Sequence, residues 1–256
     1  MLDYAAFPEQ RQSLIRQLLA SEGRVVGTAL AERLQVSEHT IRRDLQELAR
    51  EGVCKRVYGG AVSVVPPSGD LAARAEQGSA EKARLAAACA GLVKAGSCIF
   101  IDAGSTNLAF AHALPDDLAF TAATNTPAIA VALMAHPLCE VIMLGGRLQR
   151  QTGGSVGITA QQQAAQIYFD QLFLGGCALD ADEGLTVFDY EDAAFKKAMI
   201  VRSDEVIVAI TAEKVPGVAR HHVAACEEIA VLVMENSLPT TTLAAFKEKN
   251  IRLVHP

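Results

Sequence analysis

Residues 36–45 read Val36-Ser37-Glu38-His39-Thr40-Ile41-Arg42-Arg43-Asp44-Leu45, and this stretch decides the fold of the amino-terminal part. Ser37 suits the N-cap of a helix, because its hydroxyl can accept a hydrogen bond from a free backbone N–H of the first turn. Ile41, Leu45 and Leu48 then share one face of that helix. The other face carries donors and cations, namely His39, Arg42, Arg43, Gln46 and Arg50. A helix with an apolar back and a cationic front suits the major groove of duplex DNA.

The residues before this stretch complete a three-helix arrangement. Residues 27–34 predict a short amphipathic helix in which Leu30 and Leu34 share a face, and residues 35–37 predict a turn. Residues 7–20 predict a further apolar helix. Taken alone, the helix after Ser37 could instead be an ordinary solvated surface helix that carries a few arginines. The three parts together favour a helix-turn-helix whose second helix reads DNA.

A basic hairpin is predicted to follow this helix. Residues 53–65 place β-branched side chains on both sides of Gly59-Gly60, which is a hairpin signal. Such a hairpin is a wing, whose cations can contact phosphate without reading sequence, and it also closes the core of the small domain. The residues expected to contact DNA are Ser37, His39, Thr40, Arg42, Arg43, Gln46, Lys55, Arg56 and Tyr58.

These motifs resemble the N-terminal domain of the DeoR family of bacterial transcription regulators. The matching residues are the T-I-R-R-D-L run from Thr40 to Leu45 and the R-x-x-G-G-A run that begins at Arg56. The chain departs from the family at Tyr58, where the family often has His, although Tyr can also donate a hydrogen bond to phosphate. The resemblance implies double-stranded operator DNA as a partner.

The charge of the chain is unevenly divided along its length. The 256 residues allow one large domain or two ordinary ones, half of them are hydrophobic, and the net charge is −6. The first 60 residues hold nine Arg and Lys against eight Asp and Glu, whereas the rest hold fourteen against twenty-one. A nearly neutral DNA-binding part must rely on well-placed cations and on several copies binding together. We therefore expect a homo-oligomer, either a dimer or a tetramer.

Several kinds of site and location are disfavoured by the sequence. None of the six cysteines forms a CxxC pair and most lie in apolar runs, so we expect small buried side chains in a reducing cytosol. We expect no metal site and no cofactor. No signal peptide and no apolar run of membrane length are present, which predicts a cytoplasmic protein without a membrane partner.

The run Pro66-Pro67-Ser68-Gly69-Asp70 predicts a break between two domains. We expect a winged helix-turn-helix domain over residues 1–65, a linker over 66–79 and an α/β domain over 80–256. An Ala-rich helix over residues 80–94 is followed by short apolar strands that alternate with helices, at residues 98–101, 119–123, 141–144, 171–174, 205–210 and 229–233. Apolar strands without alternation indicate a mostly parallel sheet with helices on both faces.

The carboxyl ends of these strands carry the second candidate site, because ligands bind there in open α/β sheets. Glycines let backbone N–H groups approach an anion, and hydroxyls and helix N-termini add donors, which suits a phosphate or a polyol. The candidates are Asp102, Gly104, Ser105, Thr106, Thr124, Asn125, Gly145, Gly146, Gly175 and Lys214. The alternative for each Gly-Gly pair is a plain turn. Neither a P-loop nor a dinucleotide-binding fingerprint is present after the first strand.

The second half resembles the C-terminal sensor domain of the same family. The match rests on D-x-G-[ST]-T at Asp102–Thr106, T-N at Thr124-Asn125, L-G-G at Leu144–Gly146, F-L-G at Phe173–Gly175 and an acidic-x-x-x-Lys-x-x-Met run from Asp192 through Lys196. The resemblance implies a fold similar to ribose-5-phosphate isomerase and to sugar-phosphate deaminases, and a phosphorylated sugar as effector. It adds Asp192 and Lys196 to the candidate ligand residues, although a surface ion pair is the alternative for two residues four apart on a helix. Asp192 stands where the family often has Glu, and Thr211 stands where its D-x-S-K motif has Asp.

These patterns predict a transcription regulator, a repressor of a carbohydrate-use operon controlled by a phosphorylated sugar. The main alternative is a sugar-phosphate isomerase or deaminase-like enzyme with an accessory DNA-binding domain, in which Asp102, Asp192 and Lys196 supply acid–base chemistry. A bare architectural DNA binder is a further alternative. We expect a regulator and no enzyme, because the resemblance runs through both halves of the chain.

Overall fold

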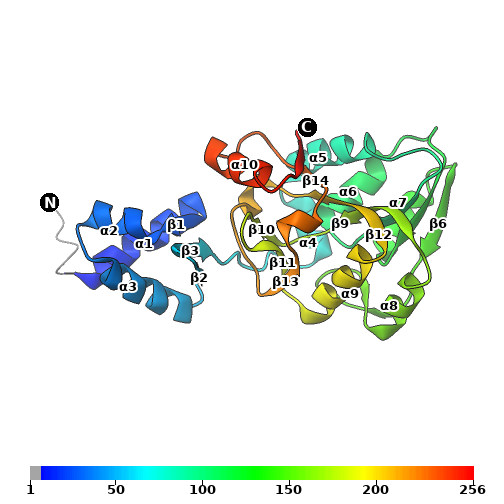
Figure 1. Ribbon diagram of the computed structural model, residues 1–256. Coiled ribbons are helices and arrows are strands. Elements are labelled where there is room, and N and C mark those ends of the chain that lie inside the picture. Colours follow the sequence, from blue (N-terminus) through cyan, green and yellow to red (C-terminus); the bar gives the residue numbers. More distant parts are fainter. Residues whose placement is uncertain (1–6) are drawn as a thin grey trace.

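The computed structural model describes residues 7–256, and Figure 1 shows a small amino-terminal body beside a larger one. The small body contains α1 (Pro8–Glu22), β1 (Arg24–Val26), α2 (Gly27–Leu34), α3 (Glu38–Arg50), β2 (Cys54–Val57) and β3 (Gly60–Ser63). Its three strands form an antiparallel sheet in the order β1-β3-β2. The predicted helices and hairpin are confirmed. The third strand, β1, was not predicted, because three residues between two helices carry no detectable period.

The turn chemistry of the small body follows the predicted pattern. The Ser37 hydroxyl accepts a hydrogen bond from the backbone N–H of Thr40 at 3.1 Å, which caps α3. The wing needs glycine at Gly60, because a Cβ there would lie 1.9 Å from the carbonyl oxygen of Val25 on the neighbouring strand. One apolar core joins the three helices to the sheet and includes Ile15, Leu19, Leu34, Ile41 and Leu48.

The segment after β3 stays attached to the larger body along its course. Val65 donates its backbone N–H to the Val218 carbonyl, and Val218 donates to the Ser63 carbonyl, both at 3.0 Å. A short helix, α4 (Leu71–Glu76), lies inside the stretch that was expected to be an irregular linker. It precedes α5 (Ser79–Ala90), the Ala-rich helix expected from the sequence.

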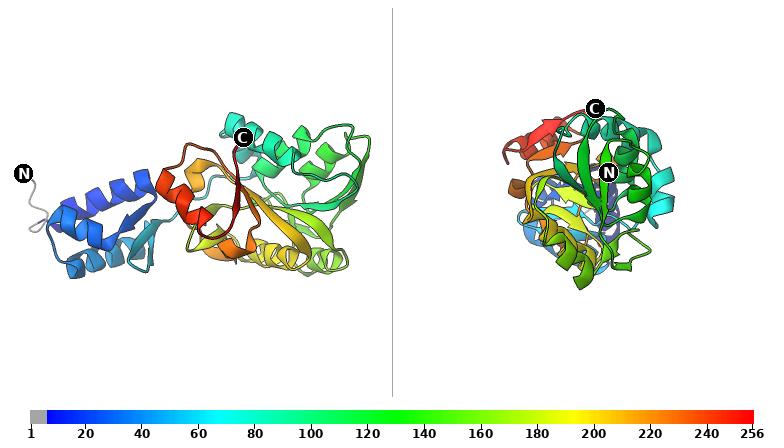
Figure 2. Two further views of the ribbon diagram at one scale, coloured as in Figure 1. Left: turned by 45° about the horizontal axis from the view of Figure 1, so that its top comes forward. Right: turned by 90° about the vertical axis from the view of Figure 1, so that its right-hand side faces the viewer.

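The larger body is built on a seven-stranded parallel sheet in the order β15-β14-β12-β9-β4-β5-β6. The strands are β4 (Cys98–Ile101), β5 (Phe120–Thr124), β6 (Cys139–Met143), β9 (Phe169–Leu174), β12 (Ser203–Ala209), β14 (Val231–Val233) and β15 (Arg252–Val254). The expected parallel sheet is therefore confirmed. Helices cover both faces (Figure 2): α5, α6 (Ser105–Ala113) and α7 (Pro127–Leu133) on one, and α8 (Ile158–Ala164) and α9 (Tyr190–Ile200) on the other.

Two smaller sheets were not expected. One joins β10 (Ala178–Asp180), β11 (Gly184–Val187) and β13 (His221–Ala224), and the other is the hairpin of β7 (Arg147–Leu148) and β8 (Ser155–Val156). The chain also forms α10 (Thr240–Lys247) and two 3₁₀ turns, η1 (Ala212–Lys214) and η2 (Cys226–Glu228). Three of the cysteines are buried as expected, whereas Cys98, Cys139 and Cys177 are only partly buried. Among residues 7–256, every helix is too short or too polar to cross a membrane.

Candidate DNA interface and effector cavity

The front of α3 is open to solvent. His39, Arg42, Arg43 and Gln46 are all exposed, and with Arg50 and Arg56 they line a groove beside the wing. Arg42 and Arg43 each lie 3.6 Å from a glutamate on their own helix, Glu38 and Glu47 respectively. Exposed pairs of this kind contribute little, so both guanidinium groups can turn to DNA at small cost.

A buried ion pair that the sequence analysis missed fixes the orientation of α3. Arg11 on α1 binds Asp44 in the middle of α3, with Nη2 at 3.0 Å from Oδ1, and both side chains are 4% exposed. Gln12 adds a hydrogen bond to Glu47 at 2.6 Å. Removing one partner of a buried pair is costly, which ties α1 firmly to the back of α3. The sequence signal for this ion pair was Arg11, which stands on the apolar side of the first helix.

The wing is divided between solvent and the larger body. Tyr58 at its tip is fully exposed, and Arg56 is exposed beside it. Lys55 instead lies 2.5 Å from Glu183, in the turn between β10 and β11. Arg24 on β1 contacts the same turn, at 3.2 Å from Asp180 and 2.6 Å from Asp182. Lys55 was expected to contact phosphate, and in this arrangement it is paired with a carboxylate instead.

A cavity of about 270 Å³ lies in the larger body at the carboxyl ends of β4, β9 and β12. Seven of the predicted ligand residues line it: Gly104, Ser105, Thr106, Gly175, Asp192, Lys196 and Lys214. The loop after β7 adds Gln151 and Thr152. The segment between the two bodies forms another wall, with Val65–Gly69, Arg74 and Gln77. Sequence reasoning missed this wall, because nothing local shows where a linker packs.

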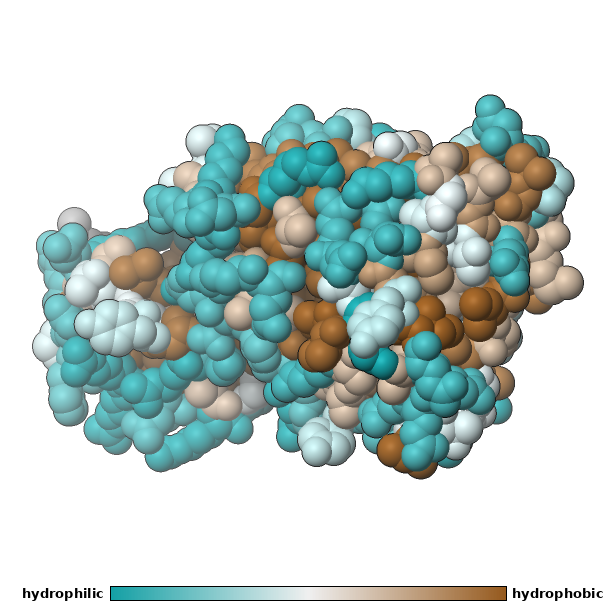
Figure 3. All heavy atoms as spheres, turned by 45° about the vertical axis from the view of Figure 1, so that its right-hand side comes forward, coloured by the Kyte–Doolittle hydropathy of each residue, from teal (hydrophilic) through white to brown (hydrophobic). Residues whose placement is uncertain are grey.

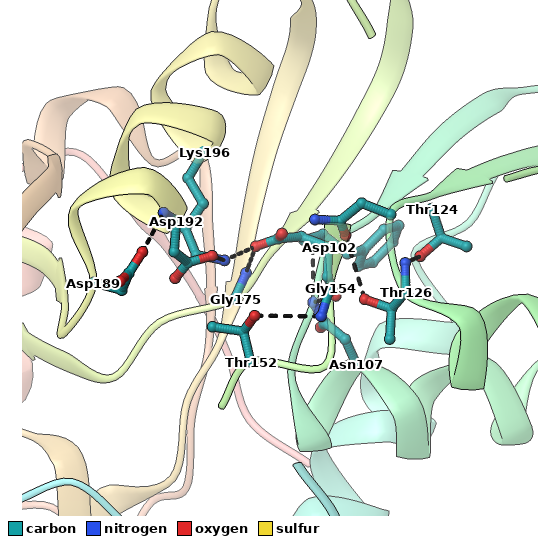
Figure 4. Close-up of polar contacts among 12 residues, drawn as sticks. Asp102, Asn107, Thr124, Thr126, Thr152, Gly154, Gly175, Asp189, Asp192 and Lys196 are labelled. Carbon is teal, nitrogen blue, oxygen red and sulfur yellow. Dashed lines mark hydrogen bonds and ion pairs between the residues drawn. The ribbon is translucent and has the colours of Figure 1, made fainter. Parts of the chain in front are cut away.

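Buried charges form the floor of this cavity (Figure 4). The Lys196 ammonium contacts Oδ2 of Asp102 and lies 3.2 Å from Oδ1 of Asp192, and all three side chains are at most 4% exposed. Gly175 donates its backbone N–H to the same Asp102 oxygen at 2.8 Å. The surface ion pair considered for Asp192 and Lys196 is therefore wrong. The other Asp102 oxygen, Oδ1, is buried and has no hydrogen-bond partner among residues 7–256.

The three buried groups perturb one another. Burial raises the pKa of Asp192 to about 6, while the Lys196 ammonium pulls it down and the Asp102 carboxylate pushes it up. Burial lowers the pKa of Lys196, but the two carboxylates outweigh that effect and hold it above its usual value. Lys196 therefore stays charged, and the pKa of Asp192 lies well above that of an ordinary aspartate.

Cations gather at the side of the cavity that faces the linker. Burial lowers the pKa of Lys214, and the nearby Arg74 charge acts in the same direction. Arg74 donates to the carbonyls of Gly69 and Gln151 at 2.8 Å, which joins the linker to the loop after β7. The buried Lys82 donates to the carbonyls of Arg74 and Gln77 and so closes the turn between α4 and α5. Arg74 was also missed, although it is the one cation in the Ala-rich α4.

The departure from the family pattern at Thr211 leaves an acidic group nearby. The Thr211 hydroxyl lies 3.2 Å from the Glu213 carboxylate, and Glu213 lines the cavity beside Lys214. An acid is therefore retained two residues further along the chain.

Five predicted ligand residues lie outside the cavity lining. Asp102 lies directly beneath it, where it holds Lys196 and Gly175. Asn125 donates to the Ser155 carbonyl at 3.1 Å, and Thr124 accepts from the backbone N–H of Thr126 at 3.1 Å. Gly145 donates to Gln163 at 2.7 Å, and Gly146 adopts a positive φ at the start of the β7–β8 hairpin. Of these four residues, Asn125 holds the β7–β8 hairpin through Ser155, and direct effector contact by any of them stays a prediction.

Comparison with known proteins assigns the family. The model of the DeoR-like helix-turn-helix domain matches residues 11–66, and that of the DeoR C terminal sensor domain matches residues 77–236. The chain belongs to the DeoR family. It is a DeoR-family transcription regulator and not an enzyme, so the enzyme alternative is wrong.

Relatives of this DeoR-family chain match it over nearly its full length. The HTH-type transcriptional regulator GlpR of Haloferax volcanii is 31% identical over 96% of the chain and 97% of its own length. The glycerol-3-phosphate regulon repressor of Escherichia coli is 31% identical over 95% of the chain and 97% of its own length. The transcriptional repressor AccR of Agrobacterium fabrum is 33% identical over 91% of each. Ribose 5-phosphate isomerase A from Methanocaldococcus jannaschii superposes with a TM-score of 0.40 at 16% identity, over 53% of this chain and 54% of the isomerase.

Proposed function

We propose that this DeoR-family regulator represses a carbohydrate-use operon and that a phosphorylated sugar in the cavity controls its hold on operator DNA. The cavity carries the proposal. It places Arg74 and Lys214 on one side, the start of α6 on another and buried carboxylates at its floor. Cations and helix N-termini stabilise a phosphate, and buried carboxylates accept hydrogen bonds from sugar hydroxyls.

The relatives support the class of effector. The Escherichia coli relative is named for the regulon of glycerol-3-phosphate, a phosphorylated polyol. Another relative from the same species is a putative repressor of an aga operon, 28% identical over 96% of this chain and 93% of its own length. Both names fit a repressor that responds to carbon metabolism.

We propose double-stranded operator DNA as the macromolecular partner, bound by a dimer or tetramer of this chain. The exposed front of α3 would read bases, and the wing residues Arg56 and Tyr58 would contact phosphate. Residues 1–65 would form the DNA-binding domain, 66–79 the linker and 80–256 the sensor domain. Every one of the nine predicted DNA-contacting residues is exposed or partly exposed, which this role requires.

The linker is the route by which the effector would act on DNA. It walls the cavity at Val65–Gly69, and Arg74 joins it to the loop after β7. Lys214 is followed by the loop that hydrogen-bonds to Ser63 and Val65 through Val218. An effector held by Arg74 and Lys214 therefore contacts both segments that connect the two bodies. If it favours an arrangement that cannot bind DNA, it shifts the population away from the operator.

A thermal-shift screen tests the effector class. The full chain is mixed with a panel of phosphorylated sugars and polyols and, separately, with the same compounds lacking phosphate. We expect at least one phosphorylated compound to raise Tm and its dephosphorylated form to leave Tm unchanged. Lys214→Met should lose the shift, whereas Lys249→Met, which removes an ammonium on the surface, should keep it. A panel in which no phosphorylated compound raises Tm would contradict the proposal.

A further inference from the structure

Helix α7 is unusual among the helices of the larger body because all of its residues are apolar. It reads Pro127-Ala128-Ile129-Ala130-Val131-Ala132-Leu133. Ile129, Ala130, Ala132 and Leu133 are buried, and they pack on the face of the sheet that α5 and α6 also cover. A helix that is apolar on every side is normally covered on every side. The outer side of α7 is bare.

The exposed residues of α7 and of the turn after it form a continuous apolar strip. Between residues 127 and 138, the exposed positions are Pro127, Ala128, Val131, Met134, Ala135, Pro137 and Leu138, which we call the α7 strip. Val131 is 70% exposed, Met134 75% and Leu138 50%. None of these exposed positions is charged or carries a hydroxyl; the exposed Asp116 lies beside the strip, 3.4 Å from the buried His136. Figure 3 shows brown and tan residues gathered over the end of the molecule that comes forward, where α7 and β6 lie.

Other helices of this body do not share the feature. The exposed side of α5 carries Arg84, and that of α9 carries Glu191 and Lys197. Contiguous apolar surface of this kind marks an interaction site in a protein that otherwise keeps charges outside.

The strip adjoins a free sheet edge. Strand β6 is the last of the seven strands, so one side of its backbone has no neighbour within the described chain. Met143 at its end is 39% exposed. A bare edge strand beside an apolar helix face is prone to aggregate unless another chain covers it.

We propose that the α7 strip and the β6 edge bind the same surface of a second copy of this chain, in a two-fold symmetric interface. The proposal locates the oligomer interface and rests on the proposed multi-copy binding to DNA. Figure 1 places α7 and β6 at the end of the molecule away from the helix-turn-helix, so this contact leaves the front of α3 uncovered.

The charge pattern favours a second copy over an unrelated partner. A two-fold interface brings each patch against itself, which any net charge would oppose, and the α7 strip has none. On β6 the exception is Glu140, which is exposed. If two β6 strands pair antiparallel about Val141, Glu140 lies opposite Ile142 of the other copy, because 140 and 142 are equidistant from the centre. The like charges then do not oppose each other directly.

Sedimentation velocity on the full-length chain tests the interface. Val131→Glu with Met134→Glu places two carboxylates on the strip, where a symmetric contact would set four together. Both side chains are exposed, so the isolated fold should be kept, as circular dichroism and Tm would show. The control is Val201→Glu, which places one carboxylate at an apolar position that is 82% exposed and outside the strip.

We expect the wild type and the control to associate and the double variant to dissociate, with a dissociation constant raised about a hundredfold or more. Pure protein is used, so loss of association identifies the second copy as the partner. An oligomer that the double variant leaves unchanged would overturn the interface while leaving the proposed effector and DNA binding intact. A wild type that stays monomeric at every concentration would overturn both the interface and binding to DNA as a preformed oligomer. Association lost equally in the control would also overturn the interface, because the effect would not depend on the strip.

Discussion

Arg43 is the residue that we expect to read bases most directly. It is exposed on the front of α3 and held only by a 3.6 Å ion pair to Glu47. We predict that Arg43→Ala weakens binding to the specific operator by about 1–3 kcal/mol, the range for a good base contact. Gel-shift titration measures the affinity for the operator, and Arg252→Ala on β15 of the larger body is the control. Unchanged affinity would remove Arg43 from the reading surface.

Asp102 is the residue that connects the cavity floor to the sheet. Asp102→Asn keeps the size of the side chain but removes the charge that holds Lys196 and weakens the acceptor for Gly175. We predict unchanged DNA affinity without effector and loss of the effector response, because Lys196 is then no longer held at the floor of the cavity. DNA binding is measured with and without the effector found by the thermal-shift screen. The control is Asp204→Asn, an exposed site; a normal response in the Asp102 variant would place the ligand elsewhere.

Helix α9 carries a group that makes stability depend on pH. Burial raises the pKa of Asp192 to about 6, whereas the pKa of an Asp in the unfolded chain is about 3.9. Between these values the folded chain holds a proton that the unfolded chain has lost, so raising the pH through this window lowers the contribution of Asp192 to stability. The amide in Asp192→Asn does not titrate, so the stability of this variant does not fall through residue 192 as the pH rises.

We therefore predict that the wild type loses stability relative to Asp192→Asn as pH rises from about 4 to about 7. Urea unfolding at several pH values gives the difference in the free energy of unfolding between the two proteins. Asp117→Asn, at an exposed position, should show no such trend. A difference that stays constant with pH would mean that Asp192 titrates like an ordinary surface carboxylate.

The elements that could be predicted are those whose cause is local. Ser37 as N-cap, the apolar spacing of Ile41 and Leu45, and the unbroken apolar strands all act within a few residues, and the structure confirms them. The Arg11–Asp44 pair joins residues 33 positions apart, so no local pattern signals it. The strands β10, β11 and β13 have only three or four residues each, and β13 pairs with β11 across a long connection, so no local pattern signals this sheet.

The candidate site was predictable to a similar degree. Seven of the predicted residues line the cavity, five because strand ends in a parallel sheet meet at one edge, and Asp192 and Lys196 because the family resemblance pointed to them. Arg74 was missed because its place in the cavity depends on the path of the linker, which only the packed molecule defines. Asn125 was expected at the ligand by the same reasoning; in the structure its amide donates to the Ser155 carbonyl, and its contact with an effector stays a prediction.

At the scale of the whole molecule, the turn between β10 and β11 is expected to compete with DNA for the wing. Glu183 binds Lys55 at 2.5 Å, and the Lys55 side chain is 53% exposed. We predict that Glu183→Gln raises DNA affinity by about twofold to fivefold, since exposed ion pairs contribute about 0.2–1 kcal/mol. The gain should shrink as salt is raised, because released Lys55 acts on phosphate.

Fluorescence anisotropy with a labelled operator measures this effect. Glu227→Gln is the control, because Glu227 pairs with Lys249 outside the contact between the two bodies. Equal or weaker DNA binding by Glu183→Gln would show that the turn does not restrain the wing.

The most direct test of the central claim is a titration of the full-length chain against its own upstream DNA, with and without the phosphorylated sugar that raises its Tm. The account predicts tight, specific binding through α3 and a loss of affinity of about 5–150-fold when the effector is present, the usual range of allosteric coupling. Binding that no phosphorylated sugar changes, in a protein whose Tm such a sugar does raise, would contradict control of the DNA-reading helix by the cavity.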